Sequence, residues 1–196
     1  MMQHTAAGKI KLFIGPMFSG KTTTMLTAVE RMAIAGHKCV VIKYIKDVRY
    51  SDRPVVRSHS GKTFTEDIDS IRVVSAECLA DVALDEYETV VGIDEGQFYA
   101  DIVEVCTRWA DTGKLIFVAA LDGNFMRIPM GKIPELISVS DKVTKLNAIC
   151  MGCGRPAPFS SRIAAAPLVG DILIGGKDKY KTLCRRCWNN DNAGHI

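Results

Sequence analysis

The stretch GPMFSGKT at residues 15 to 22 decides the fold of this chain. It matches the pattern GxxxxGK(S/T), whose backbone N–H groups wrap a polyphosphate at the N-terminal end of a helix. The apolar run KIKLFI at 9 to 14 predicts a strand before it, and helically spaced apolar residues from Met25 to Ala33 predict a helix after it. The alternative is an ordinary glycine turn that caps a helix. Because strand, loop and helix occur in the required order, we favour a phosphate-binding loop, or P-loop.

The residues of this loop have distinct expected tasks. Gly15 and Gly20 allow the backbone to follow a tight path. Lys21 is expected to reach the β- and γ-phosphates of ATP, and the Thr22 hydroxyl is expected to bind Mg²⁺. The loop residues that we expect to contact the nucleotide are Gly15, Pro16, Met17, Phe18, Ser19, Gly20, Lys21 and Thr22.

Further apolar runs continue an alternation of strands and helices. KCVVIK at 38 to 43 follows Gly36, which suits a helix end, and it closes a strand, helix, strand unit that implies parallel pairing. TVVGI at 89 to 93 and KLIFVAAL at 114 to 121 have the character of interior parallel strands, buried on both faces. We therefore predict an α/β fold with a parallel sheet flanked by helices.

Weaker patterns complete this expected sheet. IRVVS at 71 to 75 predicts one more strand, and AECLADVAL at 76 to 84 predicts a helix. Another helix is expected to begin after Asp101, acting as its N-cap, and to end at Gly113. The polar segment from 44 to 67 predicts a flexible excursion or a hairpin.

Two acidic residues follow the expected strand at 89 to 93, in the run VVGIDEGQF. Ligands gather at the carboxyl ends of strands in open parallel sheets, so both carboxylates should face the nucleotide. We expect Asp94 to be the Walker-B carboxylate that steadies Mg²⁺, and Glu95 to orient an attacking hydroxyl and accept its proton. A solvated acidic pair at a strand end is the alternative, which the upstream P-loop makes less favoured.

The seven cysteines divide into two groups. Cys150 and Cys153 form one CxxC pair, and Cys184 and Cys187 form another. Four thiolates in this spacing predict a closed, structural Zn²⁺ site, with buried free cysteines or a disulfide as the alternative. The remaining three lie in apolar segments and are expected in the core: Cys39, Cys78 and Cys106.

Bulk properties limit the possible functions. The chain has 196 residues, 47% of them hydrophobic, and a net charge of +3 without any block of like charges. These values predict no nucleic-acid or membrane patch, and the N-terminus lacks a secretory pattern, so an intracellular location is expected. Glycine, proline and cysteine pairs replace strands and helices late in the chain, which predicts two domains, 1–140 and 141–196.

Several motifs occur together in an order that resembles the type II thymidine kinases of cells and large DNA viruses. The resemblance runs from about residue 9 to 188 and rests on GPMFSGKT, KYIKDVRYS, GIDEGQF, AALDGNF, the cysteine pairs and IGGKDKY. It implies a RecA-like P-loop domain with a small C-terminal zinc-binding lasso domain. It also implies transfer of the ATP γ-phosphate to the 5′-hydroxyl of deoxythymidine in nucleotide salvage, a cytoplasmic homotetramer, and feedback inhibition by dTTP.

The resemblance also assigns residues. Glu95 matches the catalytic base, while Arg49 and Asp47 match polar groups near the transferred phosphate; Lys21 and Gln97 match residues around ATP. The expected lining of the thymine pocket consists of Met17, Phe98, Leu121, Phe125 and Tyr180. Backbone groups of the lasso are expected to hold the base at Ser160, Asp171, Ile172, Leu173, Ile174 and Gly175.

The chain departs from the family pattern in places. Threonine replaces serine at Thr22, which keeps the hydroxyl, and Thr24 replaces a common glutamate. The interval between the cysteine pairs is longer than in cellular members. Two rival functions remain open on the sequence alone: a kinase for another nucleoside, such as deoxycytidine or deoxyuridine, and a nucleotide-sensing adaptor whose zinc ribbon binds protein or nucleic acid.

Overall fold

A six-stranded, fully parallel sheet forms the centre of the molecule. The computed structural model describes residues 7–46, 56–57, 63–64, 70–163 and 178–192. The order of strands across the sheet is β5-β2-β6-β7-β1-β8, and every neighbouring pair is parallel. Their bounds, in that order, are Ile71–Ala76, Lys38–Tyr44, Glu88–Ile93, Leu115–Leu121, Lys9–Gly15 and Lys142–Lys145. The predicted α/β fold is confirmed. All five strands expected from the sequence, at 9–14, 38–43, 71–75, 89–93 and 114–121, are present.

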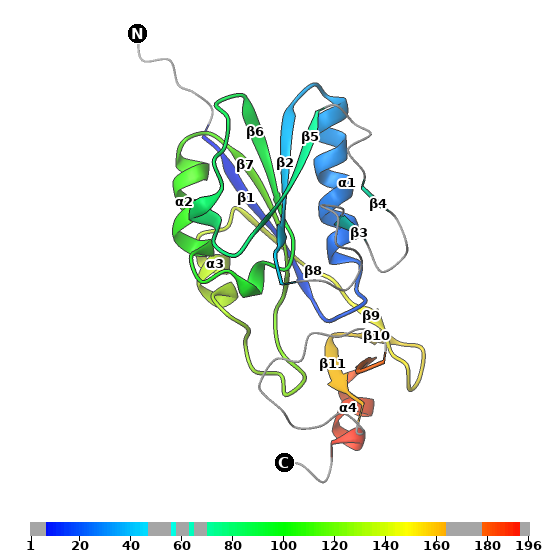
Figure 1. The fold of residues 1–196 in the computed structure, drawn as a ribbon. Helices are drawn as coiled ribbons and strands as arrows, with labels where there is room; N and C mark the ends of the chain where they lie inside the picture. Colours follow the sequence, from blue (N-terminus) through cyan, green and yellow to red (C-terminus); the bar gives the residue numbers. More distant parts are fainter. Residues whose placement is uncertain (1–6, 47–55, 58–62, 65–69, 164–177, 193–196) are drawn as a thin grey trace.

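Helices cover both faces of this sheet (Figure 1). Helix α1 (Lys21–Ile34) packs on one face, and α2 (Ile102–Asp111) and α3 (Ile133–Ser138) pack on the other. The two faces arise from strand alternation. Along β7, for example, Ile116 and Val118 belong to the α2 side while Phe117 and Ala119 belong to the α1 side. Strands buried on both faces read as continuous apolar runs for this reason.

The segment before β6 departs from the expected helix. Residues 76 to 84 form only the short 3-10 turn η1 (Leu79–Asp81), with Leu79 fully buried. Asp101 explains part of the difference, because its Oδ2 accepts a hydrogen bond from the Ala80 N–H at 2.8 Å. Asp101 precedes α2 as expected, but its side chain makes no capping bond to that helix. The expected capping role is therefore wrong, since this carboxylate holds η1 instead.

A short hairpin lies between β2 and β5. Strands β3 (Val56–Arg57) and β4 (Thr63–Phe64) pair antiparallel, which agrees with one of the two expectations for residues 44 to 67. Among the described residues, no helix is both long enough and apolar enough to span a bilayer.

A small module follows the sheet, and its elements are two-stranded ribbons and one helix. Strands β9 (Ala148–Ile149) and β10 (Pro156–Ala157) pair with each other, as do β11 (Phe159–Arg162) and β12 (Tyr180–Leu183). Helix α4 (Arg185–Asp191) ends the module. In Figure 1 it lies beyond the end of the sheet where β1 turns into α1. Strand β8 falls after residue 141 yet pairs with β1, so the main sheet extends past the boundary that we expected. The domain division remains a prediction.

Candidate active site and cysteine cluster

The loop between β1 and α1 has the backbone that a phosphate cradle needs. Gly15 has φ of 146° and Gly20 has φ of 81°, both in the region that favours glycine. A Cβ atom on Gly15 would lie 2.3 Å from the carbonyl oxygen of Leu146, so any side chain there would displace the segment after β8. The loop therefore owes its path to glycine at these two positions, as the sequence pattern predicts.

Lys21 lies across this loop. Its Nζ donates to the carbonyl oxygen of Pro16 at 2.7 Å, and the Ser19 hydroxyl donates to the same oxygen at 2.8 Å. Phe18 adopts φ of 60°, a rare value for a residue with a side chain. The ammonium group is thus held beside the N-terminus of α1, the position from which it can meet a phosphate anion.

Thr22 and Asp94 meet at the carboxyl end of the sheet. The Thr22 hydroxyl donates to Asp94 Oδ1 at 2.8 Å, although 72 residues separate them in sequence. Asp94 directly follows β6 and is buried, and its backbone N–H donates to the carbonyl oxygen of Ile42 on β2. A hydroxyl and a carboxylate placed together supply hard oxygen ligands of the kind that Mg²⁺ prefers, so this pair fits that ion.

Glu95 has an unusual backbone. Its φ of 53° and ψ of 43° are left-handed, and the 3-10 turn η2 (Gly96–Phe98) follows immediately. Such a conformation costs of order 1–3 kcal/mol and is concentrated at functional sites. Its side chain accepts a hydrogen bond from Nε2 of Gln97, whose Oε1 in turn accepts one from the backbone N–H of Leu121. Glu95 is thus partly buried beside Asp94, with its carboxylate held by an adjacent amide.

The residues expected to line the base pocket are spread over both parts of the molecule. Met17 is buried, and its backbone N–H donates to the Ser160 hydroxyl at 3.1 Å, which joins the P-loop to β11. Phe98 stacks on Tyr44 with ring centroids 5.0 Å apart, and Tyr180 is buried at the start of β12. Asp47, Arg49 and the stretch Asp171 to Gly175 lie outside the described residues.

Phe125 is held by residues that the sequence analysis missed. Its carbonyl oxygen accepts a hydrogen bond from Trp188 Nε1 at 3.2 Å, and its ring faces the Arg162 guanidinium. Arg127 stacks on the Trp188 ring, with its Cζ 3.6 Å from the ring centroid. No spacing signal in one sequence could pair residues 61 positions apart, which is why Arg127 and Trp188 were not singled out.

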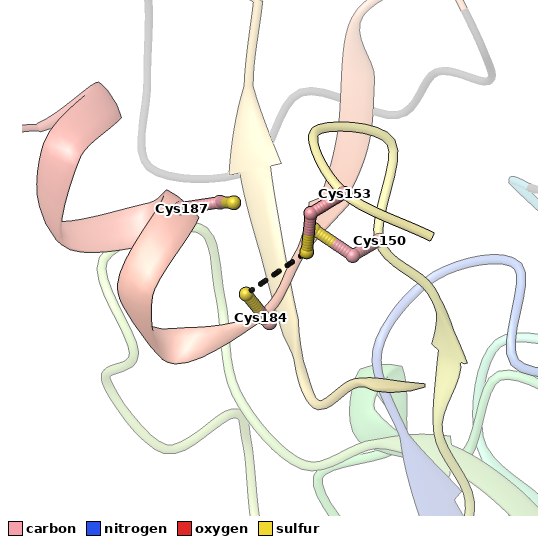
Figure 2. A group of neighbouring side chains, drawn as sticks. All are labelled: Cys150, Cys153, Cys184 and Cys187. Carbon is pink, nitrogen blue, oxygen red and sulfur yellow. Dashed lines mark hydrogen bonds between the residues drawn. The ribbon is translucent and has the colours of Figure 1, made fainter. Parts of the chain in front are cut away.

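The four paired cysteines form a cluster (Figure 2). All four sulfur atoms lie within 4.8 Å of one another, and Cys153 Sγ is 3.6 Å from Cys184 Sγ. Tetrahedral Zn²⁺ with sulfur at about 2.3 Å needs sulfur–sulfur separations near 3.8 Å, so the donor set fits a structural zinc site. Cys150 and Cys153 come from the turn after β9, whereas Cys184 and Cys187 flank the start of α4.

The protonation of these thiols also suits a metal. Burial acts to raise the pKa of Cys150, but hydrogen bonds from the backbone of Cys184 and Gly152 lower it to about 6. The pKa of Cys187 is raised to about 12, because its thiol is hydrogen-bonded to Cys184 and the other sulfurs. Four close sulfurs cannot all ionise together without a cation to offset their charge, and the thiolate is the form that binds zinc.

The three other cysteines do not share one environment. Cys39 and Cys106 are buried in the sheet and in α2, as expected, and burial raises the pKa of each thiol. Cys78 is exposed, so its expected place in the core is wrong. The physical reason is that residues 76 to 84 are not helical and do not turn this side chain toward the sheet.

Proteins of similar sequence identify the family of this chain. The family model described as thymidine kinase matches residues 8–188. The thymidine kinase of Myxoma virus (strain Lausanne) is 47% identical over 182 residues, covering 92% of this chain and 96% of the viral one. The thymidine kinase of Variola virus is 45% identical over 183 residues, with coverage of 92% and 97%. The cytosolic thymidine kinase of Homo sapiens is 43% identical over 188 residues, covering 95% of this chain and 76% of the human one. With its P-loop, its acidic pair at the end of β6 and its likeness to these enzymes over nearly its whole length, this chain belongs to the thymidine kinase family, whose members phosphorylate thymidine with ATP.

Proposed function

We propose that this kinase carries out its phosphoryl transfer at the carboxyl end of the parallel sheet, with Glu95 as the general base. The observation that carries the proposal is the bond between Thr22 and Asp94, which brings the P-loop and the acidic end of β6 into one site. Glu95 is the next residue, so its carboxylate adjoins the place where a P-loop presents the terminal phosphate. The proposed product is the 5′-monophosphate of deoxythymidine.

Each residue of the site has a proposed task. The backbone amides of residues 15 to 20 bind the β- and γ-phosphates, and Lys21 offsets their negative charge. Thr22 and Asp94 would hold Mg²⁺, which would neutralise further phosphate charge. Glu95 orients the 5′-hydroxyl toward the γ-phosphorus and accepts its proton as the new oxygen–phosphorus bond forms and the bond from that phosphorus to ADP breaks, so that ADP leaves. On the strength of the family resemblance, Arg49 is proposed to balance charge on the transferred group, and Asp47 is proposed as a second polar contact.

The small module formed by β9 to β12 and α4 holds the four paired cysteines and is called the cysteine module. The nucleoside is proposed to lie between this end of the sheet and the cysteine module. The Met17–Ser160 hydrogen bond places the P-loop directly against β11, and Phe125 is fixed to α4 through Trp188. A flat base suits a slot lined by apolar and aromatic side chains, here proposed to be Met17, Phe98, Leu121, Phe125 and Tyr180. Backbone groups near Ser160 and at 171 to 175 are proposed to read the base edge. The family resemblance further supports a cytoplasmic homotetramer that dTTP inhibits and that binds no nucleic acid.

The test of the proposed base is Glu95→Gln, measured in the steady state with thymidine and ATP. The amide keeps the shape of the side chain but cannot accept the proton, so turnover should fall by about 10²–10⁴-fold while the Kd for ATP stays nearly constant. Glu86→Gln, at an acidic residue in the turn before β6, serves as the matched control and should leave turnover unchanged. A Glu95→Gln enzyme that turns over at the normal rate would remove Glu95 from this role.

A nucleoside panel tests the proposed base specificity. Backbone groups that read thymine should also accept uracil and reject cytosine, because the exocyclic amine of cytosine reverses one donor and acceptor. Rates of ATP-dependent phosphorylation should therefore rank thymidine and deoxyuridine above deoxycytidine. A clear preference for deoxycytidine would contradict the proposed pocket without affecting the role of Glu95.

A further inference from the structure

Gln97 occupies a buried position directly behind Glu95. It lies in η2, and only 5% of its surface is exposed. Its amide makes two hydrogen bonds in opposite directions: Oε1 accepts from the backbone N–H of Leu121 at 2.9 Å, and Nε2 donates to Glu95 Oε2. The sequence resemblance places this residue among those around ATP, but its side chain is directed to the acidic residue and to β7.

The end of the sheet explains why an amide is needed here. Strand β6 stops pairing with β7 at Ile93 and Val118, so β7 continues past its neighbour to Leu121. The backbone N–H of Leu121 accordingly takes a side-chain acceptor. Because a backbone N–H can only donate, the Gln97 oxygen must face it, and the NH₂ group must then face Glu95. The strand end fixes the orientation of the amide.

Close packing fixes the backbone of Gln97 as well. A Cβ atom on Gly96 would lie 2.7 Å from Val118 Cγ1, so η2 sits tightly on β7. On the other side, a Cβ atom on Gly131 would lie 2.2 Å from the Gln97 carbonyl oxygen, and Gly131 itself has φ of 52°. Two close approaches, each requiring glycine, therefore hold the Gln97 backbone between β7 and the loop before α3. A donor mounted this rigidly can fix the carboxylate that it bonds.

We propose that Gln97 is a positioning residue for Glu95, holding its carboxylate in one orientation. The proposal rests on the proposed role of Glu95 as the general base. A general base has to lie within hydrogen-bond reach of the proton that it accepts, so a carboxylate held in one orientation can meet the 5′-hydroxyl without first reorienting. Gln97 thereby connects the end of β7, next to the P-loop strand β1, to the group that activates the nucleoside.

The decisive variant is Gln97→Glu, with the pH dependence of kcat/KM for thymidine as the readout. One carboxylate oxygen can still accept from Leu121, but the other now faces Glu95, and two like charges disfavour ionisation. The acid limb of the profile should move upward by about one pH unit or more, and activity should recover as the pH rises. KM for ATP should stay close to the parent value. A damaged fold would instead lower activity equally at every pH.

Gln97→Met is the second variant, because a buried extra charge can also impair folding. Methionine matches the length of glutamine without adding charge, yet it cannot donate to Glu95. The Glu95 carboxylate then loses its fixed orientation, so kcat should fall more than KM for thymidine rises.

The possible results separate the two proposals. If Glu95→Gln is inactive but Gln97→Glu keeps the parental acid limb and Gln97→Met keeps the parental kcat, or if the main change in both variants is a higher KM for ATP, Gln97 does not position the base. If Glu95→Gln turns over normally, the base assignment itself fails, and the positioning role fails with it.

Discussion

The nucleotide end of the sheet and the cysteine module are stabilised in different ways. The P-loop and the acidic pair rest on two large apolar clusters, one on each face of the sheet. Among its described residues, 148–163 and 178–192, the cysteine module has one small cluster, built from Ala148, Cys150, Ala157, Leu183 and Trp188. A core of that size supplies little hydrophobic free energy, and a metal ion bound by the four cysteines would add stability that this core lacks. The two regions should therefore respond differently to the same kind of damage.

Removing one zinc ligand should separate the two regions most clearly. Structural zinc contributes about 10–16 kcal/mol in isolated fingers, so Cys153→Ser should abolish stoichiometric zinc and unfold the module. Because the sheet keeps its own core, ATP binding should persist, weakened by the loss of the Ser160 contact to the P-loop, while thymidine binding is lost. Elemental analysis should find about one zinc per parent chain and much less in the variant. Calorimetric titration with each substrate should then detect binding of ATP but not of thymidine.

Cys78→Ser is the matched control for that experiment. Cys78 is exposed and outside the cluster, so this variant should retain its zinc and bind both substrates normally. A metal-free Cys153→Ser enzyme with full activity would contradict the structural role of zinc. Equal loss of ATP and thymidine binding would show that the sheet depends on the module as well.

The same contrast determines how much could be predicted from the sequence. The P-loop is local: its glycines, Lys21 and Thr22 occupy one continuous stretch between a strand and a helix, so its structure follows from spacing. The parallel strands were equally predictable, since burial on both faces leaves continuous apolar runs. The clustering of the four paired cysteines was predictable because the CxxC spacing is typical of metal ligands.

Other features could not be predicted, because they depend on contacts between distant segments. The segment at 76 to 84 has helical spacing, yet Asp101 and the burial of Leu79 hold it as a single turn. The partners of Gln97 could not be predicted either, since Leu121 becomes its neighbour only where β7 extends beyond the end of β6. Tertiary context overrides local preference in both places.

A smaller effect is expected where the two regions meet at the P-loop. The hydroxyl of Ser160 accepts a hydrogen bond from the buried backbone N–H of Met17. Ser160→Ala leaves that donor without its acceptor. A buried donor without a partner costs about 1–3 kcal/mol, and the strained path of the P-loop should relax to recover part of it. We expect kcat/KM for ATP to fall by between about fivefold and 100-fold, measured at saturating thymidine.

Ser161→Ala provides the control within the same strand. The Ser161 hydroxyl donates to Asp191 Oδ2 at 3.0 Å, a bond that lies wholly inside the module. Losing it should lower the thermal stability of the module and leave kcat/KM for ATP unchanged. If Ser160→Ala and Ser161→Ala lower kcat/KM for ATP equally, the Met17–Ser160 hydrogen bond is not what links the module to the P-loop.

The smallest effect should come from the contact between α4 and Phe125. Trp188→Phe removes the hydrogen bond to the Phe125 carbonyl oxygen but keeps an aromatic ring beneath Arg127. Such a bond contributes about 1 kcal/mol net, so KM for thymidine should rise by about fivefold while KM for ATP is unaffected. Trp109→Phe, at a buried tryptophan of α2 in the sheet core, should change stability but neither KM. Parallel rises in both KM values for Trp188→Phe would mean that α4 supports the whole enzyme rather than the nucleoside side alone. A selective rise would show that the cysteine module controls the binding of thymidine through Phe125, while the sheet controls the binding of ATP.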